Sequence, residues 1–341
     1  MRSLLIIISI LTLLGENTHL SSQGKNCGLA LVAEITISKN TSSFIHDIEF
    51  DSSGNYLAYV SDDEFVIWDI SNQQYKWRFP TIGGYRVVFG TGSKIALSAN
   101  QSVYFWHNLS DANTWEELRI EGNTRITSVG DLQFNENGDE LIASRRGHYG
   151  ITRWSLIDGS TQYHLEELAE NEGDFTIASM LSPDGKLSVT WKAGDGVFIT
   201  NTDDNSIIGR IEPLNDRNYG LQLLAFVSPS RFLVSEQDSN GAFESKLLIV
   251  DISGEIIEEY TYGFNTLWTA TAFNPIDDVL VLANGVDNQF YVYNNNYSQE
   301  ICISESLHPM VTTLAFSPDG TLLASGGADG TVRLWGIPAG E

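Results

Sequence analysis

Short runs of alternating apolar and polar residues, separated by turns, follow one another along most of this chain. The clearest stretch is VTTLAFSPDGTLLASGGADGTVRLW, from Val311 to Trp335. It holds three strand-like runs, joined by turns that end at Gly320 and Gly330. Gly and Asp favour the tight backbone reversals that connect antiparallel strands. The pattern therefore predicts a small antiparallel meander of three strands.

The same order of strands and turns recurs upstream, so the chain is built from repeats. One large apolar residue ends the first strand of each copy: Phe50, Phe89, Phe134, Leu181, Phe226, Phe273 and Phe316. A second set of residues ends the third strands: Trp68, Trp106, Trp154, Thr200, Val250, Tyr293 and Trp335. Successive first-strand ends lie between 39 and 47 residues apart. Seven copies account for residues 28–338.

This pattern resembles the WD-repeat family, whose repeats of about 40 to 45 residues each supply four strands of a propeller blade. The last copy carries the strongest match, and Thr200 and Val250 replace the closing Trp in two middle copies. The resemblance implies an all-β fold, a seven-bladed β-propeller of four-stranded antiparallel blades. It also implies a single domain over residues 28–338.

The ring needs one more strand, because the last copy supplies only three. Residues 29–38 alternate with a period of two, which predicts a strand near the start of the chain. We expect this strand to join the last blade and close the ring, as is the habit of the family. Closure leaves no split blade, whose unpaired strand would be an exposed sheet edge.

Within a blade, the resemblance implies a hydrogen-bond network of a His, a Ser or Thr, an Asp and the closing Trp. The seventh copy offers His308, Ser325, Asp329 and Trp335. We interpret the set as structural, since each hydrogen bond contributes about 1 kcal/mol and the network satisfies buried polar groups. The alternative is that His308 is a catalytic base oriented by Asp329.

The first residues differ from the rest of the chain. Arg2 precedes an apolar run from Leu4 to Leu14, and polar residues follow. The run is too short to span a bilayer and is typical of a signal peptide, which we place at residues 1–22. The sequence thus predicts a secreted or periplasmic protein that is not inserted in a membrane after signal removal. In that oxidising setting, Cys27 and Cys302 either form a disulfide or are two small apolar residues.

Composition narrows the partners and the chemistry. Lys and Arg total 19 against 44 Asp and Glu, a formal charge of -25, which disfavours nucleic acid and anionic membrane surfaces. No phosphate-binding loop, zinc-protease motif or nucleophile elbow occurs, so we predict no catalytic residue, metal or cofactor. His46 and Asp47 are neighbours in a predicted strand, where adjacent side chains point to opposite faces. A site assembled from seven separate segments would escape this test.

The resemblance implies that partners dock on the face around the central channel. Positions six and four residues before each first-strand end would line its mouth, and the candidates are Phe44, His46, Tyr85, Phe175, Leu267 and Met310. Arg146 and Tyr149, in a turn of the third copy, add a basic and aromatic pair. Gathered apolar side chains indicate recognition. Alternatively, Phe175 and Leu267 pack between blades, and Arg146 and Tyr149 are ordinary surface residues.

These observations predict a monomeric, non-enzymatic scaffold that binds a peptide or protein segment on the channel face. One alternative is a propeller enzyme of lactonase or hydrolase type, with a site in the central channel. Converging carboxylates, His or a metal in the channel would favour it. Another alternative is a periplasmic assembly propeller like that of the Tol system, which the DGTVRLW ending at Trp335 disfavours.

Overall fold

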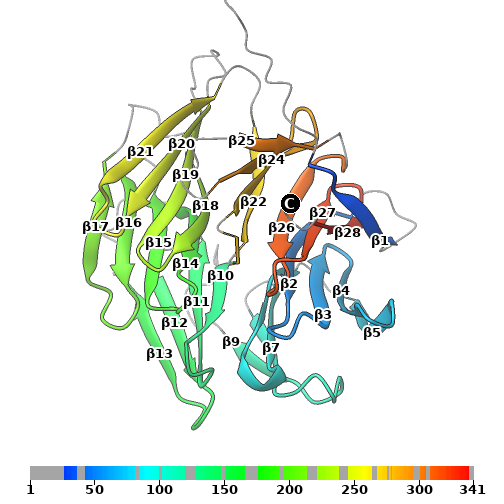
Figure 1. Cartoon of the computed structure of the whole chain (residues 1–341). Coiled ribbons are helices and arrows are strands. Elements are labelled where there is room, and N and C mark those ends of the chain that lie inside the picture. Colours follow the sequence, from blue (N-terminus) through cyan, green and yellow to red (C-terminus); the bar gives the residue numbers. More distant parts are fainter. Residues whose placement is uncertain are drawn as a thin grey trace, which may run out of the picture.

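The computed structural model describes most of the chain after the first 26 residues. The described residues are 27–36, 43–80, 84–99, 102–119, 128–146, 150–165, 176–192, 195–212, 221–237, 245–262, 267–274, 276–277, 279–294, 300–304 and 308–337. They form seven four-stranded antiparallel sheets, which stand as the blades of a propeller (Figure 1). The predicted all-β, seven-bladed propeller is confirmed. The signal peptide expected at 1–22 lies outside the described residues.

Each blade follows the chain from an inner to an outer strand. Blade 1 comprises β2 (Ile45–Phe50), β3 (Tyr56–Ser61), β4 (Glu64–Asp69) and β5 (Gln74–Pro80). Blade 2 comprises β6 (Gly84–Phe89), β7 (Ile95–Ala99), β8 (Ser102–Trp106) and β9 (Glu116–Arg119). Blade 3 comprises β10 (Ser128–Phe134), β11 (Glu140–Arg146), β12 (Gly150–Ser155) and β13 (Thr161–Leu165). Blade 4 comprises β14 (Thr176–Leu181), β15 (Leu187–Lys192), β16 (Gly196–Asn201) and β17 (Ile207–Ile211). Blade 5 comprises β18 (Leu221–Ser228), β19 (Arg231–Gln237), β20 (Ser245–Asp251) and β21 (Ile256–Tyr262). Blade 6 comprises β22 (Trp268–Asn274), β23 (Val279–Asn284), β24 (Gln289–Tyr293) and β25 (Glu300–Ile303). Within the described ranges, no helix has the length and hydrophobicity needed to cross a bilayer.

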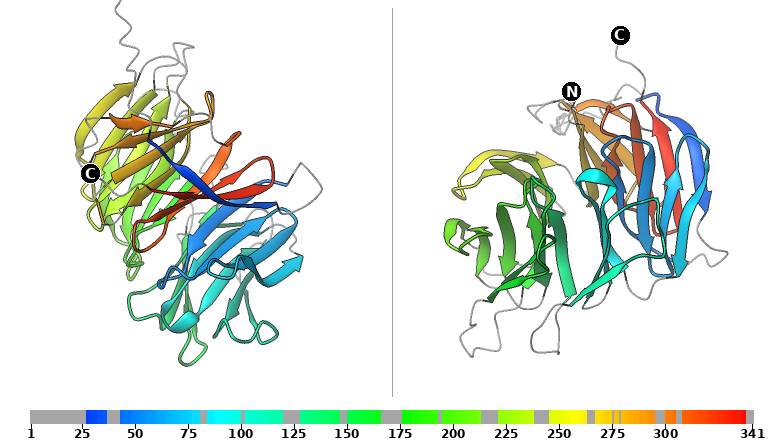
Figure 2. Two further views of the ribbon diagram at one scale, coloured as in Figure 1. Left: turned by 45° about the vertical axis from the view of Figure 1, so that its right-hand side comes forward. Right: turned by 90° about the horizontal axis from the view of Figure 1, so that it is seen from below.

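Blade 7 is assembled from both ends of the described chain. It holds β26 (Val311–Phe316), β27 (Leu322–Gly327) and β28 (Thr331–Gly336), and its outer strand is β1 (Ala30–Thr36). β1 and β28 run antiparallel and lie side by side, the blue and red strands of Figure 2. The predicted closure of the ring by the N-terminal strand is confirmed.

The turn between β26 and β27 illustrates how sequence sets local structure. Asp319 accepts the backbone N–H of Thr321 at 3.1 Å, and Ser317 Oγ accepts that of Leu322 at 2.9 Å. Gly320 has φ 70°, which L residues with a side chain rarely adopt. A Cβ there would also lie 2.6 Å from Asn274 Oδ1 in blade 6. The glycine is thus needed for both the turn and the packing of blade 7 on blade 6.

The apolar core lies between neighbouring blades rather than in one central mass. Phe105 and Phe134, for instance, pack in one cluster between blades 2 and 3. Among the side chains that the structure describes, the cluster between blades 3 and 4 has three buried members: Ile142, Ile151 and Leu181. Strands such as β3 and β7 are buried along nearly their whole length, because neighbouring blades cover both faces of the sheet.

Polar contacts supplement the small cluster between blades 3 and 4. Arg153 of β12 donates to Thr202 Oγ1 at 3.0 Å and to Asp203 Oδ1 at 2.7 Å. Ser144 and Ser179 share a hydrogen bond of 2.8 Å. We call these five residues the polar seam. Among the described side chains, directional bonds thus contribute to the contact between blades 3 and 4 alongside the small apolar cluster.

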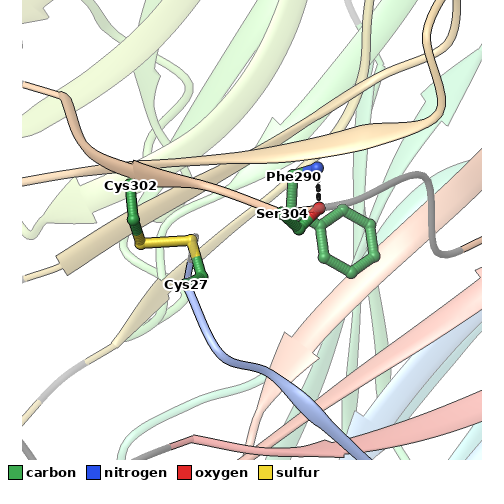
Figure 3. Close-up of a disulfide and its surroundings, with 4 residues drawn as sticks. All are labelled: Cys27, Phe290, Cys302 and Ser304. Carbon is green, nitrogen blue, oxygen red and sulfur yellow. Dashed lines mark hydrogen bonds between the residues drawn. A yellow bond between two sulfur atoms is a disulfide. The ribbon is translucent and has the colours of Figure 1, made fainter. Parts of the chain in front are cut away.

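A disulfide attaches the closing strand to a second blade. Cys27 precedes β1, Cys302 lies in β25 of blade 6, and the two are bonded (Figure 3). Of the alternatives that the sequence left open, the disulfide is the one found. Beside it, Ser304 Oγ accepts the backbone N–H of Phe290 at 2.7 Å. β1 is consequently held to blade 7 by hydrogen bonds and to blade 6 by a covalent bond.

Candidate partner-binding face and central channel

A β-bulge interrupts the inner strand of every blade near the channel. The bulged residues are His46, Tyr85, Gly130, Ile177, Leu224, Thr269 and Thr312. A bulge inserts an unpaired residue and re-aims the side chains beside it. His46 and Asp47 consequently both line the channel, although strict alternation would place them on opposite faces.

The channel contains a cavity of about 530 Å³ lined by all seven inner strands. Its wall formed by blades 1 and 2 carries charged and polar groups, His46, Asp47 and Arg86. Its blade 4 and 5 side is largely apolar, with Met180, Trp191, Leu221, Leu223 and Leu224. Its blade 6 and 7 side carries Thr269, Thr271, Thr312 and Thr313. The volume falls in the range of small-molecule sites and also suits one inserted side chain.

Arg86 lies between two carboxylates in the channel. Its Nη1 is 3.4 Å from Asp47 Oδ1, and its Nε is 3.6 Å from Asp131 Oδ1. Each carboxylate also accepts a backbone N–H from the next blade, Asp47 from Val87 at 3.0 Å and Asp131 from Leu181 at 2.7 Å. The cluster thus ties blades 1 to 4 together around the channel.

Burial controls the protonation of these groups. It raises the pKa of Asp47 to about 6, against the opposing influence of Arg86. It also raises the pKa of Glu49 well above its usual value, although Glu49 accepts the N–H of Phe89 at 2.8 Å. For Arg86, burial acts against the charge, but Asp47 and Asp131 outweigh it and the pKa is raised. The channel therefore holds one cation, Arg86, against two carboxylates, and these neighbours outweigh the effect of burial on the arginine.

The sequence contained a signal for this cluster that our sequence analysis missed. Asp47, Arg86 and Asp131 each lie three residues before a first-strand end, in copies one, two and three. Equivalent repeat positions meet around the axis of a propeller. Aligning the copies on Phe50, Phe89 and Phe134 would have brought the three charges together.

His46 is engaged at the rim. Its Nε2 lies 2.7 Å from Asp62 Oδ1, and its ring centroid is 5.1 Å from that of Tyr85 in blade 2. Asp62 Oδ2 accepts the backbone N–H of Phe44 at 3.1 Å. The partner of His46 is therefore Asp62, and the arrangement fixes the rim where blades 1 and 2 meet.

Four of the six candidate positions named from the repeat register present exposed apolar side chains. Phe44 is 41% exposed, Tyr85 40%, Leu267 39% and Met310 51%, so Leu267 is not packed away between blades. Val286, 54% exposed in the β23–β24 turn, lies beside them and was missed. An apolar residue within the turn GVDN was the available signal. We call Phe44, Tyr85, Leu267, Val286 and Met310 the apolar crescent.

The remaining candidates cannot be placed. Phe175 and Tyr149 lie outside the described residues, and Arg146 is described only through its backbone at the end of β11. Their roles stay predictions.

Met310 has an unusual backbone for an exposed residue. Its φ is 47°, in the left-handed region that costs a non-glycine residue about 1 kcal/mol or more. Two bonds hold it there: its N–H donates to Asn288 Oδ1 at 2.7 Å, and its carbonyl accepts the N–H of Ala328 at 3.1 Å. The exposed side chain is thus presented from a fixed position spanning blades 6 and 7.

The predicted network of blade 7 is present in the structure. His308 Nδ1 lies 2.8 Å from Ser325 Oγ, which also accepts Trp335 Nε1–H at 2.8 Å, and His308 Nε2 lies 3.1 Å from Asp329 Oδ1. His308 is fully buried. Burial, helped by Arg333, lowers the pKa of His308 to about 4, so the ring is neutral at pH 7. These contacts favour the structural interpretation over a catalytic base.

No cation site emerges from the side chains that the structure describes, since no three His, Cys, Asp or Glu residues there could hold a metal ion. The anionic groups of the channel instead bind Arg86 and backbone N–H groups.

Seven four-stranded sheets around a shared channel define the class of protein, a seven-bladed β-propeller. Residues 302–336 match the family model described as WD domain, G-beta repeat. A solved structure, the Cps50 (Swd1) beta-propeller domain of Myceliophteria thermophila, superposes with a TM-score of 0.68 at 15% identity, over 91% of this chain and 99% of that chain. It shares the fold.

Two curated relatives are similar in sequence. The serine-threonine kinase receptor-associated protein of Gallus gallus is 36% identical over 219 residues, covering 60% of this chain and 60% of that protein. Eukaryotic translation initiation factor 3 subunit I of Saccharomyces cerevisiae is 23% identical over 309 residues, covering 85% of this chain and 76% of that protein. The matches to the receptor-associated proteins span less than two thirds of those proteins' own lengths.

Proposed function

We propose that this protein is a non-enzymatic interaction scaffold that holds a peptide or protein segment at the apolar crescent. The observation that carries the proposal is a set of large exposed apolar side chains in blades 6, 7, 1 and 2, of which Tyr85 lines the channel cavity and Met310 has a strained backbone. Aromatic and apolar anchors contribute most of the energy of protein recognition. Anchors held rigidly before binding lose less entropy when the partner arrives.

The names of the relatives support a role in assembly. One is called a receptor-associated protein and another a subunit of an initiation factor, so both names describe proteins that associate with others. We extend to this chain only the general property of binding a protein partner.

We further propose that the protein works in an extracytoplasmic, oxidising compartment. The Cys27–Cys302 disulfide supports this, because structural disulfides persist where thiols are not kept reduced. Blocking free thiols in cells before lysis tests it. Unmodified Cys27 and Cys302 in the exported fraction would agree, and full labelling of both would contradict it.

A second candidate function is binding or conversion of a small molecule in the channel, favoured by the cavity and its carboxylates. A base for such chemistry would have to come from groups that are already engaged. Asp47 and Asp131 hold Arg86, and His46 is bonded to Asp62. The partner-binding role therefore fits the geometry better.

Crosslinking capture from the source cells tests the scaffold role. The bait is the full chain, compared with a Tyr85→Ala, Met310→Ala variant. The matched control is Ile157→Ala, Ile276→Ala, because these exposed residues lie in turns at the opposite ends of the strands. We expect a specific partner to be retained by the control and lost by the crescent variant. Equal capture by all three proteins would refute the crescent as the binding surface.

A further inference from the structure

Acidic side chains border the apolar crescent. Asp62, 46% exposed, and Asp63, also exposed, lie in the β3–β4 turn beside Phe44. Asp287 follows Val286 in the β23–β24 turn, and Asp329 lies in the β27–β28 turn, 29% exposed. These three turns all lie at the channel face, since each pairs with the residues that precede an inner strand. The border of the crescent is therefore negative from blade 6 to blade 1.

The cations closest to this border are already neutralised. Arg333 Nε lies 2.9 Å from Glu34 Oε2, and its Nη1 lies 3.3 Å from Asp329 Oδ2. Arg86 is shared between Asp47 and Asp131. Neither is available to a partner's acid without breaking two ion pairs. The whole chain carries a formal charge of -25, which reinforces the local field.

The crescent residues come from the consecutive blades 6, 7, 1 and 2, and contacts between these blades link them. Leu267 accepts through its carbonyl the N–H of Gly285, next to Val286, at 2.8 Å, and Asn288 of the same turn holds Met310. Thr312 Oγ1 donates to the carbonyl of Ile45 at 2.5 Å and joins blade 7 to blade 1. The contact of His46 with Tyr85 continues the path to blade 2. An extended or helical segment can therefore meet several anchors at once.

We propose that the crescent recognises a short segment of a partner protein that alternates apolar anchors with Lys or Arg. This rests on the proposed scaffold function and specifies its partner. Apolar side chains seat on the crescent and supply affinity, while the basic residues face Asp62, Asp63 and Asp287. An acidic segment is disfavoured, because its charges would lie against these carboxylates, and the described cations Arg86 and Arg333 are each already paired with two acids.

Synthetic peptides provide a direct test with the purified full chain. Three fluorescent twelve-residue peptides share the same Leu and Phe positions, and the remaining positions are all Lys, all Glu or all Ser. Anisotropy is measured at low salt and at high salt. We expect the Lys peptide to bind about ten-fold or more tighter than the Glu peptide at low salt, and the gap to narrow at high salt.

Matched variants locate the binding. Asp63→Asn is compared with Asp277→Asn, the same substitution at an exposed acid in the β22–β23 turn at the opposite end of the strands. Met310→Asn is compared with Ile157→Asn, since Asn tolerates the left-handed backbone of residue 310 and preserves the fold. We expect Asp63→Asn to weaken the Lys peptide about two- to five-fold and Met310→Asn about ten-fold. The two controls should bind like the parent, and thermal melting confirms that all four are folded.

The outcomes separate the preference for a basic segment, which we call the charge match, from the scaffold role. Equal affinity for the Lys and Glu peptides, or equal losses with Asp63→Asn and Asp277→Asn, overturns the inference. If capture from cells still depends on Tyr85 and Met310 in that case, the scaffold role stands alone. If the Lys peptide is preferred, Asp63→Asn narrows that preference and Met310→Asn weakens binding, then the preference of the crescent for a basic segment is supported even where capture yields no crescent-dependent partner. That last capture result counts against the scaffold role only.

Discussion

Residues on the channel face are fixed by groups from a neighbouring blade. Asn288 of blade 6 holds Met310, and Asp47 of blade 1 accepts the N–H of Val87 in blade 2. Asp131 of blade 3 does the same for Leu181 of blade 4. Because each of these polar groups is satisfied across an interface, a change at one of them affects two blades.

The buried His308 makes stability depend on pH. Its pKa is about 4 in the folded protein against 6.5 when unperturbed, so the unfolded chain binds the proton more readily between those values. Its contribution is complete above pH 6.5 and is lost as the pH falls towards 4. We expect the stability advantage of the parent over His308→Gln to shrink by roughly 2.5 kcal/mol from pH 7 to 4.5. Urea unfolding at both values measures it.

Comparing the two proteins at each pH is essential, because other groups act in the opposite direction. The raised pKa of Asp47 stabilises the folded state at low pH and that gain is lost as the pH rises through 6. This contribution is common to both proteins and cancels. A constant difference between them across the range would show that His308 does not take up the proton on unfolding.

The repeat register selected exposed apolar positions, whereas it did not predict the chemistry of the channel. A fixed offset from each first-strand end led to Phe44, Tyr85 and Met310, and all three are exposed. That they bind a partner stays a prediction. The pairing of Arg86 with two acids depends on which blades are neighbours in the ring, which a pattern within one copy does not reveal. The contact of His46 with Asp62 depends on a bulge, which strict alternation excludes.

At the scale of elements, the interfaces between blades are unequal. Among the described side chains, blades 4 and 5 share a large apolar cluster, whereas blades 3 and 4 share three buried apolar residues and the polar seam. Hydrogen bonds contribute less net stability than apolar burial of similar extent, since water competes for the same groups. The seam is therefore the interface where local opening should begin.

Removing one side chain tests this. Arg153→Met deletes the donor to Thr202 and Asp203 and leaves Glu140, its other ion-pair partner, uncompensated. We expect a loss of about 2 kcal/mol in stability and faster hydrogen exchange confined to β11, β12, β15 and β16.

Arg231→Met, at an exposed position of β19, is the control for the loss of one positive charge. Exchange that accelerated evenly around the ring in Arg153→Met would contradict a local seam.

Strand order was predictable and strand detail was not. Turn residues and a period of two located every blade in the sequence. They also located the closing strand β1, which begins within one residue of the expected start. In β18 the bulge comes two residues later than in the other blades, and a second shift follows Phe226. Such shifts arise from packing against neighbouring blades and leave no mark in the alternation.

At the scale of the whole molecule, the disulfide spans a separation of 275 residues. Closing so long a loop restricts the unfolded chain strongly, by about 5.6 kcal/mol in the chain-entropy model. We expect reduction to lower the unfolding midpoint and to accelerate exchange first in β1 and β28.

The Cys27→Ser, Cys302→Ser variant should match the reduced parent and be insensitive to reductant. If reduction left both the midpoint and β1 exchange unchanged, the bond would contribute nothing to ring closure.

The same bond also changes how the protein responds to a pulling force. Tension applied to the two chain ends enters at Cys27 and passes directly to Cys302, so the intervening loop, which contains blades 1 to 5 and most of blade 6, bears no load. Only the part of blade 7 that follows Cys302 can be drawn out. An unfolding machine that pulls the oxidised chain from its C-terminus would remove β28, β27 and β26 in turn and then stall at the Cys27–Cys302 disulfide. In the reduced chain, it would continue through every blade.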